Sequence, residues 1–90
     1  MITKKHLVIS GKVQGVGFRY WMQNLATNNN ISGWVKNKLS GDVETLIIGQ
    51  EKAVQKLIKQ CKIGPSSSTI QNIQINDYDQ DYSEKGFNIF

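Results

Sequence analysis

Apolar residues recur along the chain with two different periods, and the switches between them divide it into elements. Residues 5–13 place Leu7 and Ile9 on one face and Val8 on the other, which is the alternation of a strand. Residues 18–28 instead repeat apolar residues at helical spacing, which predicts an amphipathic helix. Its apolar stripe consists of Phe18, Trp21, Met22, Leu25 and Ala26.

The middle of the chain predicts two strands and a second helix. Residues 31–37 and 42–48 are rich in β-branched and aromatic residues, and the short connection at 38–41 ends in a glycine that suits a hairpin. Residues 50–62 return to helical spacing, and the pair Gly64-Pro65 is a typical helix stop. The apolar face of this second helix consists of Val54, Leu57, Ile58 and Cys61.

The last third of the chain predicts strands separated by a polar loop. Residues 69–76 read as a strand, but the step from Ile70 to Ile73 breaks the alternation, so we expect a bulge or a late strand start. Residues 77–84 are acidic and polar, which indicates an exposed loop. Residues 86–90 alternate again and predict a short fifth strand.

The resulting order, β-α-β-β-α-β, predicts an α+β, ferredoxin-like sandwich. We expect a four- to five-stranded, mostly antiparallel sheet with two helices on one face. Because a helix joins the strands at 5–13 and 31–37, these two strands are predicted to be parallel, with a right-handed crossover. Their carboxyl ends then meet at one edge of the sheet, which should bring Asn37 close to residues 14–19.

Length and cysteine content limit the class of protein. Ninety residues suit a single domain, predicted to span 1–90. The lone Cys61 excludes an internal disulfide and favours a reducing compartment. The N-terminal residues lack an apolar segment of signal-peptide length, and no run approaches transmembrane length. We therefore expect a cytoplasmic protein that does not act on a membrane.

The charge of the chain is uneven. The formal net charge is +4, but residues 1–62 hold ten Lys and Arg against three Asp and Glu, whereas residues 63–90 hold one against four. A basic body suits an anionic ligand, such as a phosphorylated metabolite, a nucleic acid or a membrane surface. The lysines of the second helix are interpreted as a solvated face.

The candidate chemistry centres on residues 14–19, here called the glycine turn. It contains Gly15, Gly17 and Arg19, the only arginine of the chain, between a predicted strand and a predicted helix. Glycines allow successive backbone N–H groups to point at one spot, and the first turn of a helix adds unpaired donors. A planar guanidinium can grip two oxygens of one phosphate. We interpret the glycine turn as a pocket for a phosphoryl group.

Several other residues receive structural interpretations. Asn37 taken alone would be a turn residue, and Gln14 is a candidate for orienting the glycine turn. His6 is expected at the surface, and no second His or Cys stands at ligand spacing, so no metal is expected. Trp34 is expected to be shared between the core and the pocket wall. Two further assignments are Cys61 in the core and Tyr20 at the rim of the site.

These residues resemble a known family. The segment Gly11–Arg19 (GKVQGVGFR) closely resembles the first signature of acylphosphatases, and Gly33–Asn37 (GWVKN) followed by Gly41–Glu44 (GDVE) resembles the second. Gly64-Pro65 and the closing Gly86-Phe87 are also similar to the family, so the likeness covers essentially the whole chain. The resemblance implies a single acylphosphatase-like domain and metal-independent hydrolysis of acyl phosphates to carboxylate and inorganic phosphate, without a cofactor.

The resemblance also implies the roles of individual residues. Arg19 would be the phosphate-binding catalytic residue, and Asn37 would position the attacking water for an in-line displacement. The remaining phosphate contacts would come from the backbone amides of Gly15, Val16, Gly17, Phe18 and Arg19. The expected partners are the small-molecule substrate and the phosphate product, and the expected state is a monomer.

Two other classes of function remain open at this point. RNA-recognition domains share the β-α-β-β-α-β order, and they stack bases on aromatic residues in the middle of the first and third strands. The corresponding predicted strands here, at 5–13 and 42–48, offer no such aromatic residue, so no nucleic-acid partner is expected. A non-catalytic phosphate sensor would bind the anion without turnover, and the presence of both Arg19 and Asn37 speaks against it.

Overall fold

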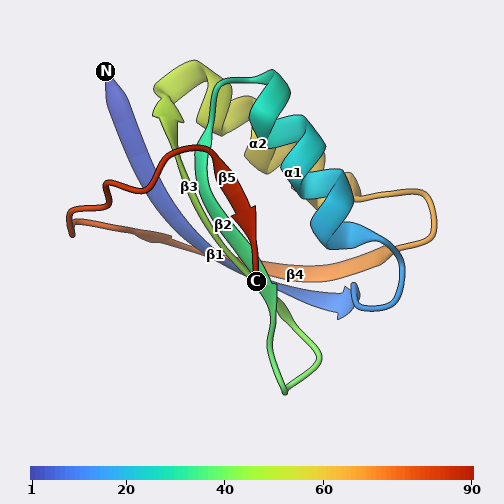
Figure 1. Cartoon of the computed structure of the whole chain (residues 1–90). Coiled ribbons are helices and arrows are strands. Elements are labelled where there is room, and N and C mark those ends of the chain that lie inside the picture. The colour runs from blue at the N-terminus through green and yellow to red at the C-terminus, as the bar shows by residue number, and fades with distance from the viewer.

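The computed structural model describes residues 1–90 and contains one sheet with two helices beside it (Figure 1). The strands are β1 (Ile2–Lys12), β2 (Ser32–Asn37), β3 (Val43–Gln50), β4 (Thr69–Asp77) and β5 (Phe87–Ile89). The helices are α1 (Phe18–Asn28) and α2 (Glu51–Ile63). Every predicted element is present, and the largest change in a boundary is the start of β1, three residues before the predicted position.

The sheet has the strand order β4-β1-β3-β2-β5. The pairs β4–β1, β1–β3 and β3–β2 are antiparallel, and only the short β5 runs parallel to its neighbour β2. Because β1 and β2 both run antiparallel to β3, they are parallel to each other, as their helical connection requires. The expected ferredoxin-like α+β architecture with a mostly antiparallel sheet is therefore confirmed.

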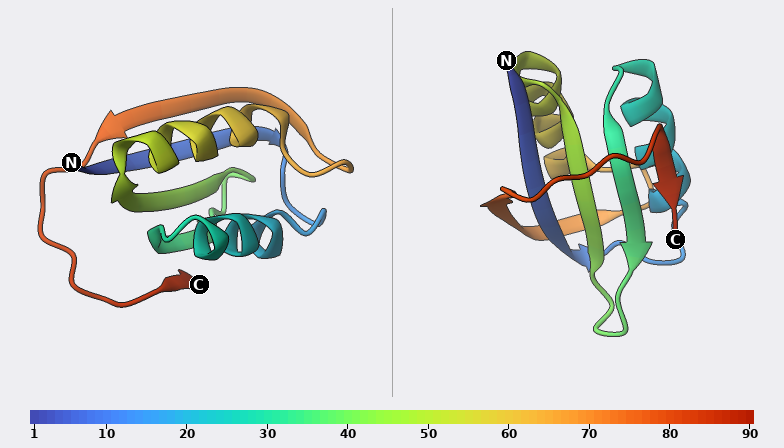
Figure 2. Two further views of the ribbon diagram at one scale, coloured as in Figure 1. Left: turned by 90° about the horizontal axis from the view of Figure 1, so that it is seen from above. Right: turned by 60° about the vertical axis from the view of Figure 1, so that its left-hand side comes forward.

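Both helices cover the same face of the sheet (Figure 2). Helix α1 packs on β2 and β5, and α2 packs on β1, β3 and β4. The predicted faces form the core, since Phe18 and Met22 of α1 and Leu57 of α2 are at most 2% exposed. Cys61 is fully buried beside the Met22 sulfur, and burial raises the pKa of its thiol to about 12. A thiol that stays protonated at neutral pH belongs to the core, as predicted.

The break in the alternation of β4 is a bulge, the first of the two predicted alternatives. Ser10 pairs with Asn72 and Gly11 pairs with Ile70, so Gln71 is the extra residue on β4. An extra residue reverses the alternation of side chains. Both Ile70 and Ile73 can therefore pack against the core from one strand.

The face of the sheet away from the helices is crossed by residues 78–86, here called the strap. The strap leaves β4 at one edge and runs in front of β1, β3 and β2 to reach β5 at the other edge (Figure 2, right). It is held by hydrogen bonds from Lys4 Nζ to the Gln80 carbonyl and from the Tyr82 hydroxyl to the Gly33 carbonyl, at 3.0 Å and 3.4 Å. None of the helices is both long and apolar enough to cross a bilayer.

Two side chains lie elsewhere than predicted. Trp34 is part of neither the core cluster nor the lining of the cavity described below. Its neighbour Val35 is buried on the helix-facing side of β2, so the alternation of the strand directs Trp34 to the other face of the sheet. There it lies in register with Leu46, which is in turn paired with His6 and is fully buried. His6 is correspondingly partly buried, with 23% of its side chain exposed.

Candidate active site

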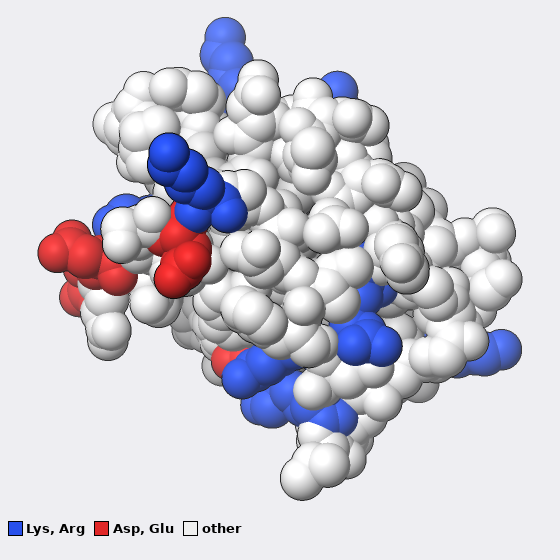
Figure 3. Space-filling model, in the orientation of Figure 1, with Lys and Arg blue, Asp and Glu red and all other residues white.

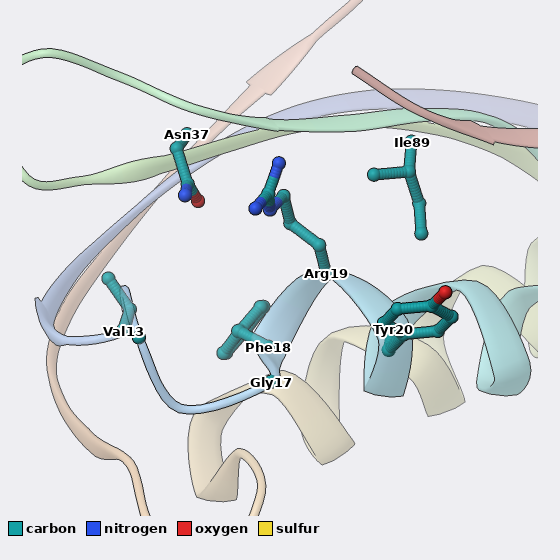
Figure 4. A pocket seen from close by; sticks show the side chains of 8 residues that line it. Val13, Gly17, Phe18, Arg19, Tyr20, Asn37 and Ile89 are labelled. Carbon is teal, nitrogen blue, oxygen red and sulfur yellow. The ribbon is translucent and has the colours of Figure 1, made fainter.

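A cavity of about 180 Å³ opens where the carboxyl ends of β1 and β2 meet the first turn of α1 (Figure 4). Segments distant in sequence therefore form one site, as the parallel arrangement of β1 and β2 predicts. The lining residues come from the end of β1 and the glycine turn (Val13, Gly15, Gly17), from α1 (Phe18, Arg19, Tyr20), from β2 (Asn37) and from β5 (Ile89).

The glycine turn adopts a conformation that glycine permits at little cost. Gly15 and Gly17 have φ angles of 73° and 76°, in the left-handed region. A Cβ at either position would meet no atom within 4 Å, so the backbone conformation, and not crowding, calls for glycine. Within residues 15–19, no backbone N–H donates a hydrogen bond to another group of the chain, and α1 has no side-chain N-cap. This cluster of free donors suits an anion.

Arg19 lies in the first turn of α1 and directs its guanidinium into the cavity (Figure 4). One nitrogen, Nη1, donates to the Phe90 carbonyl at 3.0 Å, which fixes the side chain against the segment after β5. Arg19 forms no ion pair with an Asp or Glu side chain. Its charge and remaining donors are therefore available to an anionic ligand.

Asn37 is the last residue of β2, and its position follows from the alternation of the strand. Val35 is buried under the helices, so Asn37, two residues later, projects from the same face just beyond the core. Its amide points into the cavity from the side opposite Ile89 (Figure 4). The amide makes no hydrogen bond within the chain, and its donor and acceptor are both free to hold a water.

Gln14 connects the glycine turn to the hairpin between β2 and β3. Its side-chain nitrogen donates to the carbonyls of Lys38 and Asp42, at 2.8 Å and 2.9 Å. The same hairpin is closed by the Lys38 amide on the Asp42 carbonyl at 2.8 Å. Gln14 therefore couples the glycine turn to the strand end that carries Asn37, which agrees with its predicted orienting role.

The structure brings most of the predicted residues together. Gly15, Gly17, Phe18, Arg19 and Asn37 all line the cavity, and the 72% exposed Tyr20 stands at its rim. Val16 differs, because its side chain packs against the core and only its backbone belongs to the turn.

Three contributors to the cavity were not predicted from the sequence: the side chains of Val13 and Ile89, and the carbonyl of Phe90. The contributions of Ile89 and Phe90 depend on where β5 docks. The only sequence signal for that position is the apolar alternation of residues 86–90.

A second polar group occupies the opposite face of the sheet. This group, here called the open-face cluster, consists of His6, Trp34, Lys36 and Glu44, whose side chains interact with one another. His6 Nε2 donates to Glu44 Oε2 at 2.6 Å, and Lys36 Nζ lies 3.6 Å from Glu44 Oε1 and 5.3 Å from the centre of the Trp34 ring. Partial burial opposes ionisation of Glu44, but the hydrogen bond from His6 and the charge of Lys36 outweigh it and lower the pKa of this carboxyl.

Charge is also distributed unevenly over the surface (Figure 3). In this view Lys and Arg atoms gather around the lower edge, near the β2–β3 hairpin, whereas most of the visible Asp and Glu atoms lie on the left, near the strap. Lys36 and Lys38, both exposed, flank Asn37 in the sequence. The surroundings of the cavity therefore favour the approach of an anion.

The chain is similar to proteins of one family over nearly its whole length. The family model described as acylphosphatase matches residues 5–89. An acylphosphatase of Acidiphilium cryptum is 40% identical over 83 residues, covering 92% of this chain and 90% of the relative.

Solved structures agree with this similarity. The crystal structure of acylphosphatase from Bacillus subtilis matches with a TM-score of 0.93 and 34% identity, covering 100% of this chain and 99% of the other. The structure of an acylphosphatase from Coxiella burnetii matches with a TM-score of 0.91 and 33% identity, covering 99% and 93%.

Proposed function

This chain belongs to the acylphosphatase family, whose members hydrolyse acyl phosphates, and from that premise we propose how its cavity performs the reaction. The phosphoryl group of the substrate sits in the glycine turn. Its oxygens accept hydrogen bonds from the backbone amides of residues 15–19 and from the Arg19 guanidinium. The observation that carries this proposal is the set of unbonded backbone amides in residues 15–19, the segment that ends at the only arginine of the chain.

Asn37 holds the attacking water. An amide offers one donor and one acceptor, so it can fix the position of a water and direct a lone pair at phosphorus. The water oxygen forms a bond to phosphorus while the bond between phosphorus and the acyl oxygen breaks, and the electron pair leaves with the carboxylate. One proton of the water passes to a phosphoryl oxygen, so a substrate dianion gives a carboxylate and a dihydrogen phosphate monoanion.

This reaction needs little covalent help from the protein. The carboxylate is a stable leaving group, and phosphoryl transfer depends mainly on positioning and on stabilisation of charge at the phosphoryl oxygens. The glycine turn and Arg19 supply both, because their donors are fixed before substrate arrives. No step in this mechanism requires a metal or a protein base.

The proposal extends to the state of the protein. We propose that residues 1–90 act as one catalytic domain, as a monomer in the cytoplasm. The physiological partners are the acyl phosphate and its phosphate product.

The direct test is hydrolysis of benzoyl phosphate by the purified protein in the presence of a chelator. We expect turnover that chelation does not change and that inorganic phosphate inhibits competitively. The matched control is Lys56→Gln, which removes an exposed charge on α2 away from the cavity and should keep full activity. Hydrolysis no faster than the spontaneous reaction would refute the proposed activity.

A further inference from the structure

The cavity has two sides, and the proposed reaction uses only one of them. Asn37 lies on one side of the Arg19 guanidinium, and Tyr20 and Ile89 lie on the other (Figure 4). The first side carries the glycine turn and the Asn37 amide, with Val13 and Phe18 beside them. The second side is formed by an aromatic ring and a branched aliphatic chain. Only the first side offers an amide that can hold a water, whereas the second side offers mainly apolar surface.

In-line displacement assigns a part of the substrate to each half. The attacking water and the leaving oxygen stand on opposite sides of phosphorus. Because Asn37 holds the water, the leaving oxygen and the acyl group attached to it are directed away from Asn37, toward Tyr20 and Ile89. We propose that Tyr20 and Ile89 form the acyl-binding wall and give the enzyme a preference for apolar, above all aromatic, acyl phosphates. This inference rests on the proposed function.

Tyr20 has the properties that such a wall requires. Its side chain lies outside the apolar stripe of α1, at the position directly after Arg19, and is 72% exposed. Its hydroxyl makes no hydrogen bond within the chain. A large, exposed ring beside an open cavity can cover an apolar ligand with little rearrangement, and aromatic partners add attraction beyond the area they bury.

Ile89 supplies the other half of the wall and owes its position to the pairing of β5. It stands opposite Val35 in the parallel ladder, and it faces the helices because Phe87, two residues earlier, is buried in the core. Ile89 is only partly buried, so it retains apolar surface toward the cavity. Neither wall residue carries a charge, so a charged acyl group would find no opposite charge there to compensate for its lost hydration.

The test compares benzoyl phosphate with acetyl phosphate, which share the phosphoryl group and differ in the acyl group. In the parent protein we expect the larger kcat/KM for benzoyl phosphate. In Tyr20→Ala the ratio of the two kcat/KM values should fall roughly three- to tenfold, the range of a lost aromatic contact. The inhibition constant of inorganic phosphate, which lacks an acyl group, should stay the same.

Three control variants isolate the contribution of the wall. Tyr20→Phe retains the ring and should retain the substrate ratio. Ile89→Val trims one methylene and should lower the ratio slightly without removing β5. Ile63→Ala removes a 78% exposed apolar side chain at the end of α2, outside the cavity. It should change kcat/KM for neither substrate.

The outcomes are distinguishable. An unchanged ratio in Tyr20→Ala overturns the acyl-binding wall, and so does an equal loss on both substrates with weaker phosphate inhibition, which would place Tyr20 at the phosphoryl end. A parent protein that hydrolyses neither substrate above background refutes the proposed function itself. A parent that hydrolyses both with no dependence on Tyr20 leaves the proposed function intact and refutes only the wall.

Discussion

The cavity and the open-face cluster project from opposite faces of one sheet, and they treat their polar groups differently. In the open-face cluster, Glu44 is bonded to His6 and neutralised by Lys36. In the cavity, the guanidinium of Arg19 donates only to the Phe90 main-chain oxygen and pairs with no Asp or Glu, and the amide of Asn37 has no partner within the chain. Both regions hold charge at the surface of the sheet, yet only the cavity leaves most of its side-chain donors without a partner.

This difference separates groups that stabilise the fold from groups that await a ligand. A polar group with its partners in place contributes to stability and has little left to offer a substrate. Donors that are fixed in position but unbonded hold their hydrogen-bonding capacity for another molecule. Changes in the cavity should therefore reduce activity with little loss of stability, and changes in the open-face cluster should do the reverse.

The largest effect is expected from Arg19→Lys. A lysine keeps the charge but loses the fork that can hold two phosphoryl oxygens, so kcat/KM for benzoyl phosphate should fall by at least about 10²- to 10³-fold. Steady-state kinetics measures the loss, and the midpoint of urea unfolding should move little. Turnover close to that of the parent would show that a point charge is enough.

The second-largest effect is expected from Asn37→Ala, whose kcat should fall by about 10²-fold. The mechanism assigns Asn37 to the water and not to the phosphoryl group, so inorganic phosphate should inhibit the variant as well as it inhibits the parent. Inhibition constants measured beside kcat separate the two roles. Loss of phosphate inhibition would make Asn37 a ligand of the phosphoryl group instead.

Gln14→Ala is expected to lower both stability and activity moderately. It removes two hydrogen bonds that tie the glycine turn to the β2–β3 hairpin, each contributing about 1 kcal/mol. The free energy of unfolding should fall by about 1–2 kcal/mol, and kcat should fall several-fold because the turn and Asn37 are no longer held together. A variant with reduced stability and full kcat would show that the bridge serves the fold alone.

The smallest effect on activity is expected from Glu44→Gln, which disrupts the open-face cluster. Activity at pH 7 should be unchanged, and the free energy of unfolding should fall by about 0.5 kcal/mol. Because the pKa of Glu44 is lowered in the folded state, its contribution is present above its unfolded pKa of about 4.3 and is lost as the pH falls through the folded value.

The difference in stability between parent and Glu44→Gln should therefore shrink on acidification. Urea unfolding at pH 7 and at about pH 3 measures both ends of this range. A stability difference that stays constant across the range would contradict the assignment of the lowered pKa to folding.

Residues 14–19 and Asn37 could be predicted to meet because their positions depend on local signals and on one rule of topology. Two glycines before an apolar stripe mark the turn, and a helical connection makes β1 and β2 parallel, which brings their carboxyl ends together. Neither inference requires the position of any other element. The same independence explains why the helix faces were predicted correctly and why the irregularity in β4 could be located, although the sequence left a bulge and a late strand start as alternatives.

Ile89 and the Phe90 carbonyl could not be predicted in the same way. Their positions depend on the register of a three-residue strand that follows the polar strap, and register over so short a strand has no strong signal in the sequence. Trp34 is a different case. The alternation that buries Val35 already directs Trp34 to the other face, but that face could be recognised as covered only once the strap was located across it.

The contact between Arg19 and Phe90 joins residues 71 positions apart, and it forms only after the strap has crossed the sheet and β5 has docked beside β2. The arginine thus acquires its final orientation from residues that a ribosome adds long after the arginine itself. Nascent chains that stop before β5 would carry the signature turn and its guanidinium without the anchor that aims it. The anchored orientation of Arg19 therefore depends on residues 87–90 as well as on the glycine turn.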